Sequence, residues 1–319
     1  MWVKIRTYWN LFRIPNLIII GLGICLYQYC VIVPVLSLNN FTPFLTPVRL
    51  VFVVLSVLCI VAGSFCINDY FDVTTDGVNK KDKQIVGSTV SKKQASRLYY
   101  IITAVGIILS VYPSWELDSF IIFLCFPVVA IVLWHYSYKY KRIPLLGNIL
   151  VSFLTAFSVI FISLFEILHL QSTGQNEVIR QLMSLAGSSV GFAFFFNFIR
   201  ELIKTMESAH GDSKARYNTL AVKIGIKKTK YFTLLIIALL IISLGIAAFY
   251  SYQRNIQSLF YYIIFAMILP LLFLFYKTYT IRNSKNCHWA SNLSKIIIIL
   301  ALLSLLIVRM VLLEGISLP

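Results

Sequence analysis

Carboxylates and one asparagine gather in residues 68–76, directly after a run of nearly uncharged residues, 51–67. If a helix continues through this segment, Asn68, Asp72 and Asp76 stand at positions i, i+4 and i+8 and share one face within about 12 Å. Carboxylates this close repel one another unless a cation lies among them, and oxygen ligands suit Mg²⁺ or Ca²⁺ better than softer metals. The segment therefore predicts a divalent-cation site, and the alternative is an acidic helix end that is only solvated.

A second polar segment covers residues 197–212. Its Asn197 and Glu201 repeat the i, i+4 spacing of Asn68 and Asp72, which hints at an internal duplication. Two acidic helix ends that face one cavity can hold two divalent ions, and such ions can bind a diphosphate. Nearby lysines and arginines would then bind the remaining phosphate oxygens. The two segments together predict a diphosphate site.

The elements that position these residues are membrane-spanning helices. The 319 residues are 59% hydrophobic and 13% charged, whereas about a quarter of the residues of a soluble chain are charged. The apolar runs lack the two-residue alternation of membrane barrels. We therefore expect an all-α integral membrane protein, in which residues 1–319 form one polytopic domain, a single bundle around a central cavity.

Nine apolar runs approach the roughly 20 residues that a membrane-spanning helix needs. The sixth run passes into polar sequence without a break, and His169 and His288 are expected in loops outside the runs. The six cysteines lie mostly inside apolar runs without a CxxC pair, so neither a disulfide framework nor a thiolate metal site is indicated. The runs cover residues 16–37, 50–67, 96–112, 119–137, 145–168, 179–200, 231–251, 258–277 and 292–313.

The basic residues fall almost entirely on one side of the predicted membrane. Twenty-four of the 28 lysines and arginines lie before the first run or after the second, fourth, sixth and eighth; the exceptions are Arg49, Arg180, Arg254 and Arg309. Because basic loops stay in the cytoplasm, we expect the N-terminus and the site-bearing loops there, in a prokaryotic cell membrane, and the C-terminus outside. The net charge of +16 thus reflects topology, and neither nucleic acid nor a protein partner is indicated.

Several short motifs occur in one order along nearly the whole chain. They are Arg-Ile-Pro-Asn at 13–16, Asn-Asp-x-x-Asp-x-x-x-Asp at 68–76 with Asn79 beyond it, Tyr-Ser at 136–137, Lys-Arg-Ile-Pro at 141–144, Gly-Asn at 147–148, Arg-Glu-x-x-Lys at 200–204, Gly-Asp at 211–212, Thr-Leu at 219–220 and Gly225. In this order they resemble the UbiA-type intramembrane prenyltransferases, nearest the branch that includes digeranylgeranylglyceryl phosphate synthases. Nine helices with both acidic motifs on the cytoplasmic side are also what that family has.

The resemblance implies a Mg²⁺-dependent enzyme that moves an isoprenyl group from a prenyl diphosphate to a lipophilic acceptor within the bilayer. The acceptor would be a glycerol-phosphate ether lipid, with an aromatic quinone precursor as the alternative. The metal ligands would be Asn68, Asp69, Asp72, Asp76, Glu207 and Asp212. The diphosphate would be bound by Asn16, Lys83, Arg142, Arg200 and Lys204. Asp72, Asp76, Asp212 and Lys141 would be the catalytic residues.

Some positions depart from the family pattern. Thr205 and Ser208 stand where the second motif of that branch usually has carboxylates, and His210 stands where it often has an acid. Residues 82–84 (Asp-Lys-Gln) replace the usual Arg-Pro step, and Ala215 replaces a glycine. These changes leave open a homologue that binds prenyl lipid without catalysis. A transporter is a further class, but its ion sites usually lie near the midplane of the membrane and not at one face.

Overall fold

Helices make up nearly all of this computed structural model, which describes residues 2–79, 84–282 and 284–314; these residues contain no strand. The chain divides into two compact units, each described by itself below. The first unit comprises Met1–Cys25, Phe44–Gly147 and His210–Tyr217, and the second comprises Leu26–Pro43, Asn148–Ala209 and Asn218–Pro319.

Nine helical segments within the described residues are long and apolar enough to cross a membrane, which confirms the nine predicted runs and the all-α membrane fold. Most of these segments extend beyond the apolar runs, because polar end turns continue a helix past the lipid core. The largest difference is the sixth, which ends at Lys214, where the apolar run ends near residue 200. The segments are Ile14–Leu38, Pro47–Phe71, Lys92–Glu116, Phe120–Tyr138, Leu146–Gln171, Asn176–Lys214, Ile226–Gln253, Gln257–Tyr279 and Asn286–Leu313.

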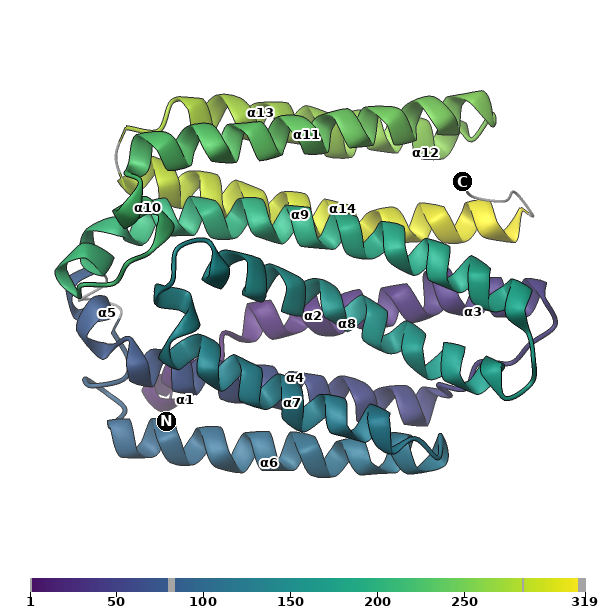
Figure 1. Cartoon of the computed structure of the whole chain (residues 1–319), viewed down its shortest axis with the longest axis horizontal. Helices are drawn as coiled ribbons and strands as arrows, with labels where there is room; N and C mark the ends of the chain where they lie inside the picture. The colour runs from purple at the N-terminus through teal and green to yellow at the C-terminus, as the bar shows by residue number, and fades with distance from the viewer. Residues whose placement is uncertain (1, 80–83, 283, 315–319) are drawn as a thin grey trace. The chain divides into compact units, whose positions relative to one another are not determined.

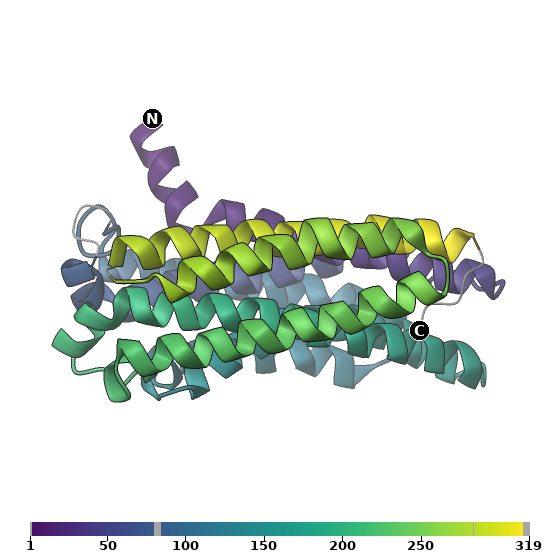
Figure 2. The same cartoon turned by 90° about the horizontal axis from the view of Figure 1, so that it is seen from above.

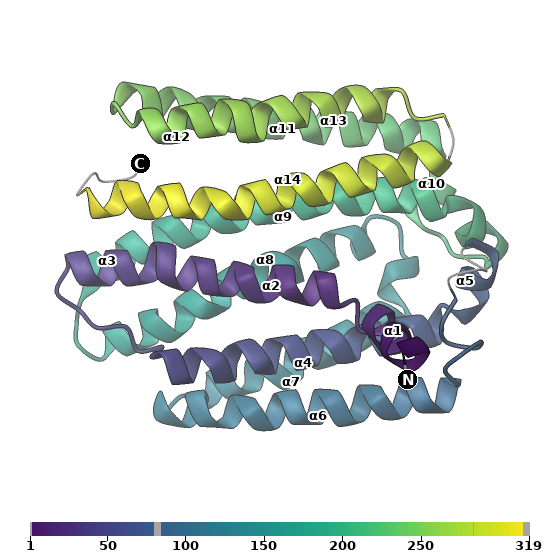
Figure 3. The same ribbon diagram turned by 180° about the vertical axis from the view of Figure 1, so that it is seen from behind.

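Three long helices form the framework of the first unit. Helices α4 (Pro47–Phe71), α6 (Lys92–Glu116) and α7 (Phe120–Tyr138) contact one another and lie side by side in Figures 1 and 3. Ser91 and Gln94 form a capping box at the start of α6. A Cβ atom at Gly106 of α6 would lie 2.8 Å from the backbone oxygen of Ser56 on α4. The missing side chain therefore lets the two helix backbones approach closely, as small residues do in membrane bundles.

The chain turns sharply between α1 (Trp2–Leu11) and α2 (Ile14–Tyr27). Arg13 lies at this turn with φ of 50°, in the left-handed region that non-glycine residues rarely adopt. Figure 2 shows α1 standing at an angle to α2. The end of α1 enters a buried cluster with the end of α4, the loop after α5 (Val73–Asn79) and the start of α6, formed by Leu11, Cys66, Ile67, Val86, Val90, Ala95 and Tyr99. This apolar packing supports the end of α4, where the first polar motif begins.

The polar segment 68–76 is not the single unbroken helix that the spacing predicts. Helix α4 ends at Phe71, Asp72 has φ of −92° and ψ of 4°, and α5 begins at Val73. The i→i−4 backbone bonds nevertheless continue, from Asp72 N to Asn68 O at 3.0 Å and from Asp76 N to Asp72 O at 2.8 Å. The altered torsion angles turn the chain locally while both turns remain helical. Asp72 lies at the bend, in a backbone region where functional residues are often found.

The second unit contains the remaining long helices. Helix α11 (Ile226–Gln253) lies beside α13 (Leu269–Tyr279) in Figure 1, and α14 (Ser284–Leu313) contacts α13 and the π-helix η1 (Gln28–Ile32). Helix α9 (Asn176–Lys214) contributes residues to the second unit as far as Ala209 and its last turn to the first. The other elements are α3 (Val33–Leu38), α8 (Leu146–Gln171), α10 (Leu220–Lys223), α12 (Gln257–Tyr262) and η4 (Ile263–Ile268). Because α8 and α14 extend beyond their apolar runs, His169 and His288 are helical, and their expected place in loops was wrong.

A polar pair lies in the apolar interior of the second unit. The Gln28 side-chain amide donates to Glu166 Oε1 at 3.3 Å, and both side chains are fully buried. Next to this pair in sequence, Ser163, three residues before Glu166, donates from Oγ to the hydroxyl of Tyr27, the residue before Gln28, at 3.3 Å. Polar groups in such surroundings need hydrogen-bond partners, so these pairs fix how α8 meets η1.

Candidate active site

The first polar motif in the first unit is organised around one ammonium group. Lys141 Nζ donates to Asp72 Oδ1 at 2.6 Å and to Asn68 Oδ1 at 3.1 Å, and Asn68 Nδ2 donates to Asp72 Oδ2 at 2.9 Å. Both ionised side chains are largely buried, at 11% exposed for Lys141 and 17% for Asp72. Burial lowers the pKa of Lys141 and outweighs the opposite effect of Asp72. The oxygens of Asn68 and Asp72 therefore converge on a positive charge, the ammonium of Lys141.

A short turn places Lys141 at these oxygens. The turn η3 (Tyr140–Arg142) follows α7, and α8 begins four residues later. A Cβ atom at Gly147 would lie only 2.7 Å from Lys141 Cα and 3.1 Å from the Tyr140 backbone oxygen. The first turn of α8 can therefore rest directly against η3 because residue 147 has no side chain. This contact fixes the backbone from which Lys141 and Arg142 extend.

Asp69 interacts with a different cation. Arg13 Nη2 donates to Asp69 Oδ1 at 2.6 Å, and the Arg13 guanidinium lies 4.8 Å from the centre of the Phe65 ring. Burial by itself would lower the pKa of Arg13, but the charges of Asp69, Asp72 and Asp76 raise it above its ordinary value. The ion pair between Arg13 and Asp69 thus connects the turn between α1 and α2 to the end of α4.

The end of α9 reaches the same unit. Asp212 is 6% exposed, and its backbone oxygen accepts a hydrogen bond from Tyr217 N at 2.8 Å. The Tyr217 hydroxyl donates to the backbone oxygen of Phe71 at 3.4 Å, and its ring centre lies 4.4 Å from Arg142 Cζ. Arg142 Nε is buried and has no hydrogen-bond partner within the described chain. The first unit therefore brings together Asp72, Lys141, Arg142 and the last turn of α9.

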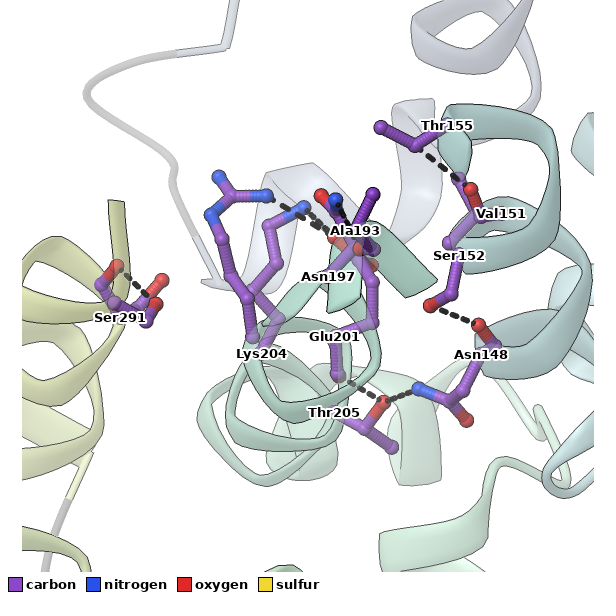
Figure 4. Close-up of polar contacts among 12 residues, drawn as sticks. Asn148, Val151, Ser152, Thr155, Ala193, Asn197, Glu201, Lys204, Thr205 and Ser291 are labelled. Atoms are coloured by element: carbon purple, nitrogen blue, oxygen red, sulfur yellow. Dashed lines mark hydrogen bonds and ion pairs between the residues drawn. The ribbon is translucent and has the colours of Figure 1, made fainter. Parts of the chain in front are cut away.

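The rest of the second motif lies in the second unit, on α9. Glu201 Oε1 accepts from Lys204 Nζ at 2.7 Å and from Arg200 Nη1 at 3.1 Å. Asn148 Nδ2 donates to Thr205 Oγ1 at 2.7 Å, and that hydroxyl donates to the Glu201 backbone oxygen at 2.8 Å, as Figure 4 shows. Thr205, which stands where a carboxylate is usual, thus joins α8 to α9 through neutral hydrogen bonds. Arg200 Nε is a second buried donor without a partner among the described residues.

Glu207 has a partner that the sequence did not indicate. His288 Nδ1 lies 2.8 Å from Glu207 Oε1, and Asn292 Nδ2 lies 3.4 Å from His288 Nε2. If the asparagine donates to Nε2, the imidazole carries its proton on Nδ1 and donates it to Glu207. The pair spans 81 residues, so no local spacing could have revealed it.

Oxygen donors suited to a hard cation are present, although no group of three or more His, Cys, Asp or Glu side chains gathers in the described part of the chain. Asn68 Oδ1 and Asp72 Oδ1 already converge on the Lys141 ammonium. Asp76 follows one turn later, half-buried, in the first turn of α5. Amide and carboxylate oxygens of this kind fit Mg²⁺. The metal roles of these residues stay predictions, as do the roles of Asn16, which is half-buried in the first turn of α2, and of Lys83, which lies outside the described residues.

Comparison with known proteins decides the family. The model of the UbiA prenyltransferase family matches residues 19–310. The chain belongs to the UbiA prenyltransferase family. It is a multi-pass integral membrane protein and an enzyme of the prenyltransferase class, as the resemblance of its motifs predicted.

Individual relatives agree with this UbiA assignment. The digeranylgeranylglyceryl phosphate synthase of Methanococcus vannielii is 28% identical over 308 residues, which cover 96% of this chain and 98% of that protein. The synthase of Sulfurisphaera tokodaii is 29% identical over 253 residues, 79% of this chain and 81% of that protein. Among solved structures, a digeranylgeranylglyceryl phosphate synthase matches with a TM-score of 0.62 and 21% identity, over 96% of this chain and 98% of the other. A UbiA homolog from Archaeoglobus fulgidus bound to GPP and Mg²⁺ matches with a TM-score of 0.57 and 15% identity, over 94% and 99%.

Proposed function

We propose that this UbiA family member transfers an isoprenyl group from a prenyl diphosphate to a glycerol-phosphate ether lipid, in a reaction that depends on Mg²⁺. The observation that carries the proposal is that buried oxygens of Asn68 and Asp72 accept hydrogen bonds from the Lys141 ammonium. The next residue, Arg142, has a buried guanidinium Nε without a partner among the described residues. Relatives that match over most of this chain are named digeranylgeranylglyceryl phosphate synthases, which supports a glycerol-phosphate acceptor.

The reaction breaks the bond between the allylic carbon and the diphosphate oxygen and forms a new bond from that carbon to an acceptor hydroxyl. The bonding electrons leave with the diphosphate, so negative charge grows on its oxygens, and the acceptor hydroxyl passes its proton to the released diphosphate or to water. When bound, Mg²⁺ supplies a Lewis acid that neutralises this growing charge. Groups already fixed before the reaction stabilise such charge most effectively.

Residues of the first unit supply the groups for this chemistry. We assign Asn68, Asp72 and Asp76 as the ligands of one Mg²⁺. Lys141 and Arg142 donate to diphosphate oxygens; the buried Nε–H of Arg142 has no other partner in the described structure, and a phosphate oxygen would satisfy it. Asp69 holds Arg13 through Oδ1.

The second motif extends the assignment in the second unit. Arg200 has a buried Nε–H without a partner in the described residues, and the Lys204 ammonium donates to Glu201 at 2.7 Å. Both suit phosphate oxygens. Glu207, oriented by His288, stays a candidate metal ligand in the second unit, and Asp212 stays one in the first unit.

We further propose that the N-terminus and both acidic motifs face the cytoplasm of a prokaryotic cell. The distribution of basic residues supports this orientation. The relatives from Methanococcus vannielii and Sulfurisphaera tokodaii support a prokaryotic cell membrane.

The test uses purified protein in liposomes with radiolabelled geranylgeranyl diphosphate and two separate acceptors, a glycerol-phosphate ether lipid and an aromatic quinone precursor. We expect labelled lipid only with the ether-lipid acceptor and only with Mg²⁺, not with EDTA. Asp72→Asn, which removes one charge at constant shape, should lower the rate by about 100-fold or more, as loss of one charge-stabilising group does. Asp118→Asn is the matched control, because Asp118 is exposed in a loop with φ of 51°, which asparagine tolerates.

The outcomes separate the alternatives. Transfer that survives both EDTA and Asp72→Asn contradicts the metal-dependent mechanism. Product formed only with the aromatic acceptor identifies a quinone-precursor enzyme. Binding of the labelled diphosphate without turnover on either acceptor identifies a homologue that binds prenyl lipid without catalysis.

A further inference from the structure

The residue that links the site segments of the first unit is Tyr217, which no motif indicates. We propose that Tyr217 is a positioning residue that orients the Arg142 guanidinium so that its N–H groups meet the diphosphate. This inference rests on the proposed function, because it takes a phosphate group as the partner of Arg142.

The contact between the two residues leaves the hydrogen-bonding edge of Arg142 available. Arg142 Cζ lies 4.4 Å from the centre of the Tyr217 ring. A guanidinium attracted to the face of a ring uses its π-surface and keeps its N–H donors pointing outward in its own plane. Arg142 Nε is buried and lacks an acceptor in the described structure, although buried donors normally have one. The Arg142 guanidinium is thus held by the ring with its Nε–H unused, as a site for an anionic oxygen requires.

Tyr217 is itself held at both ends. Its hydroxyl donates to the backbone oxygen of Phe71, the residue before Asp72, at 3.4 Å. Its backbone N–H donates to the oxygen of Asp212 at 2.8 Å. The ring is therefore tied to the bend of the first motif and to the acid of the second, and it can hold Arg142 in register with both.

The end of helix α9 explains why Tyr217 takes this place. Arg216 has φ of 56°, its N–H donates to Ser213 O at 3.1 Å, and the N–H of Tyr217 reaches back five residues to Asp212 O. These two bonds around a left-handed residue form a Schellman motif, a common helix end. The cap that terminates α9 thus sets the direction of Tyr217, so its position comes from backbone geometry and not from a flexible loop.

The experiment is a double-mutant cycle between Tyr217→Leu and Arg142→Met. It measures KM for geranylgeranyl diphosphate, kcat, and the affinity for inorganic pyrophosphate at equilibrium without an acceptor. We expect Tyr217→Leu to raise KM and weaken pyrophosphate binding about tenfold, within the range for loss of one partly buried cation–π contact, with a smaller change in kcat. In the Arg142→Met background the same substitution should change neither quantity further, because the residue it acts through is gone.

Three further variants test whether the effect is only structural. Tyr217→Phe and Tyr217→Trp keep an aromatic face and should restore most of the affinity that Tyr217→Leu loses. Tyr100→Leu removes a tyrosine side chain that is 62% exposed in the same unit and serves as the matched control. Thermal unfolding of each variant reports any loss of folding separately from affinity.

Several results would overturn the inference. If the two substitutions multiply their effects on KM and pyrophosphate affinity in the double variant, Tyr217 does not act through Arg142. The same conclusion follows if Tyr217→Phe loses as much affinity as Tyr217→Leu. Wild-type KM and pyrophosphate affinity in Arg142→Met would overturn both this inference and the role of Arg142 in the proposed function. The proposed function alone fails if the wild-type protein binds pyrophosphate with the expected coupling but transfers no prenyl group.

Discussion

The ammonium of Lys141 lies where the spacing of Asn68 and Asp72 predicts a divalent cation. It contacts one oxygen of each residue, at 3.1 and 2.6 Å. If Mg²⁺ binds at these oxygens, as the proposed function requires, it would compete with the ammonium for them. The Lys141 side chain would then be available for the diphosphate. Under that proposal, the same lysine would neutralise the motif before substrate binds and stabilise the leaving group afterwards.

Replacing this lysine should make the stability of the protein more dependent on Mg²⁺. Lys141→Met gives an unbranched side chain that is one heavy atom shorter and uncharged, which removes the ammonium bound to Asp72. We expect the free energy of unfolding to fall by about 1–3 kcal/mol without Mg²⁺, the usual cost of removing one partner from a buried polar pair. Millimolar Mg²⁺ should raise the melting temperature of the variant more than that of the wild type, because no ammonium competes for the oxygens. Thermal unfolding with and without Mg²⁺ measures both effects.

Lys93→Met is the matched control, since Lys93 is an exposed lysine in the first turn of α6. Its melting temperature should follow that of the wild type with and without the metal. Equal Mg²⁺ responses of Lys141→Met and the wild type would show that the ammonium and the metal do not share ligands.

At the residue scale, side-chain contacts were predictable from the sequence where both residues lie on one helix. Asn68 and Asp72 stand one helical turn apart, so their contact follows from helix periodicity and is confirmed at 2.9 Å. Lys141 pairs with Asp72 across 69 residues and Glu207 with His288 across 81. Such pairs depend on how each helix is rotated about its axis, which hydropathy does not fix. Tyr217 was missed for a different reason, because its position is set by the cap at the end of α9.

At the scale of elements, the bend at Asp72 is the feature that periodicity could not predict. Neither proline nor glycine occurs between Asn68 and Asp76 to mark a break. The backbone hydrogen bonds continue through the bend, and only the torsion angles of Asp72 depart from the helix. The contacts of its side chain with Asn68 and Lys141 accompany this departure. Helix periodicity therefore predicts the contact between Asn68 and Asp72 correctly, but it does not predict the bend of the backbone at Asp72.

The contact between η3 and the start of α8 leads to a second prediction. Gly147→Ala would place a Cβ atom 2.7 Å from Lys141 Cα, so η3 must move. We expect KM for the prenyl diphosphate to rise roughly tenfold or more, because small displacements of positioned groups reduce activity strongly. Steady-state kinetics in liposomes measures this change.

Gly245→Ala in α11 provides the comparison, since nothing lies within 4 Å of a Cβ atom there. Alanine is a better helix former than glycine by about 1 kcal/mol, so this control should raise the melting temperature and leave KM unchanged. Wild-type kinetics in Gly147→Ala would mean that α8 does not set the position of η3.

At the scale of the whole molecule, hydropathy predicted the number of spanning segments correctly because the cost of exposing polar groups to lipid acts on every residue. Nine segments were expected and nine occur in the described chain. Their lengths were underestimated, most clearly in α9, whose polar turns continue to Lys214. Lipid does not constrain those turns, so only their packing and hydrogen bonds could define the helix end.

The orientation of these segments gives the last prediction. In a variant without native cysteines, Lys93→Cys reports the side that carries the acidic motifs, and Ser172→Cys reports the opposite side, between the fifth and sixth segments. Both positions are exposed, so a membrane-impermeant maleimide should reach each of them from one side. We expect labelling of Ser172→Cys in intact cells and of Lys93→Cys only in inside-out vesicles, because 24 of the 28 basic residues would otherwise have to leave the cytoplasm. The reverse pattern would place both acidic motifs outside the cell. Prenyl diphosphates made in the cytoplasm could not then reach Asp72 without crossing the membrane. The proposed function would fail because the substrate could not enter the site, whatever its residues can do.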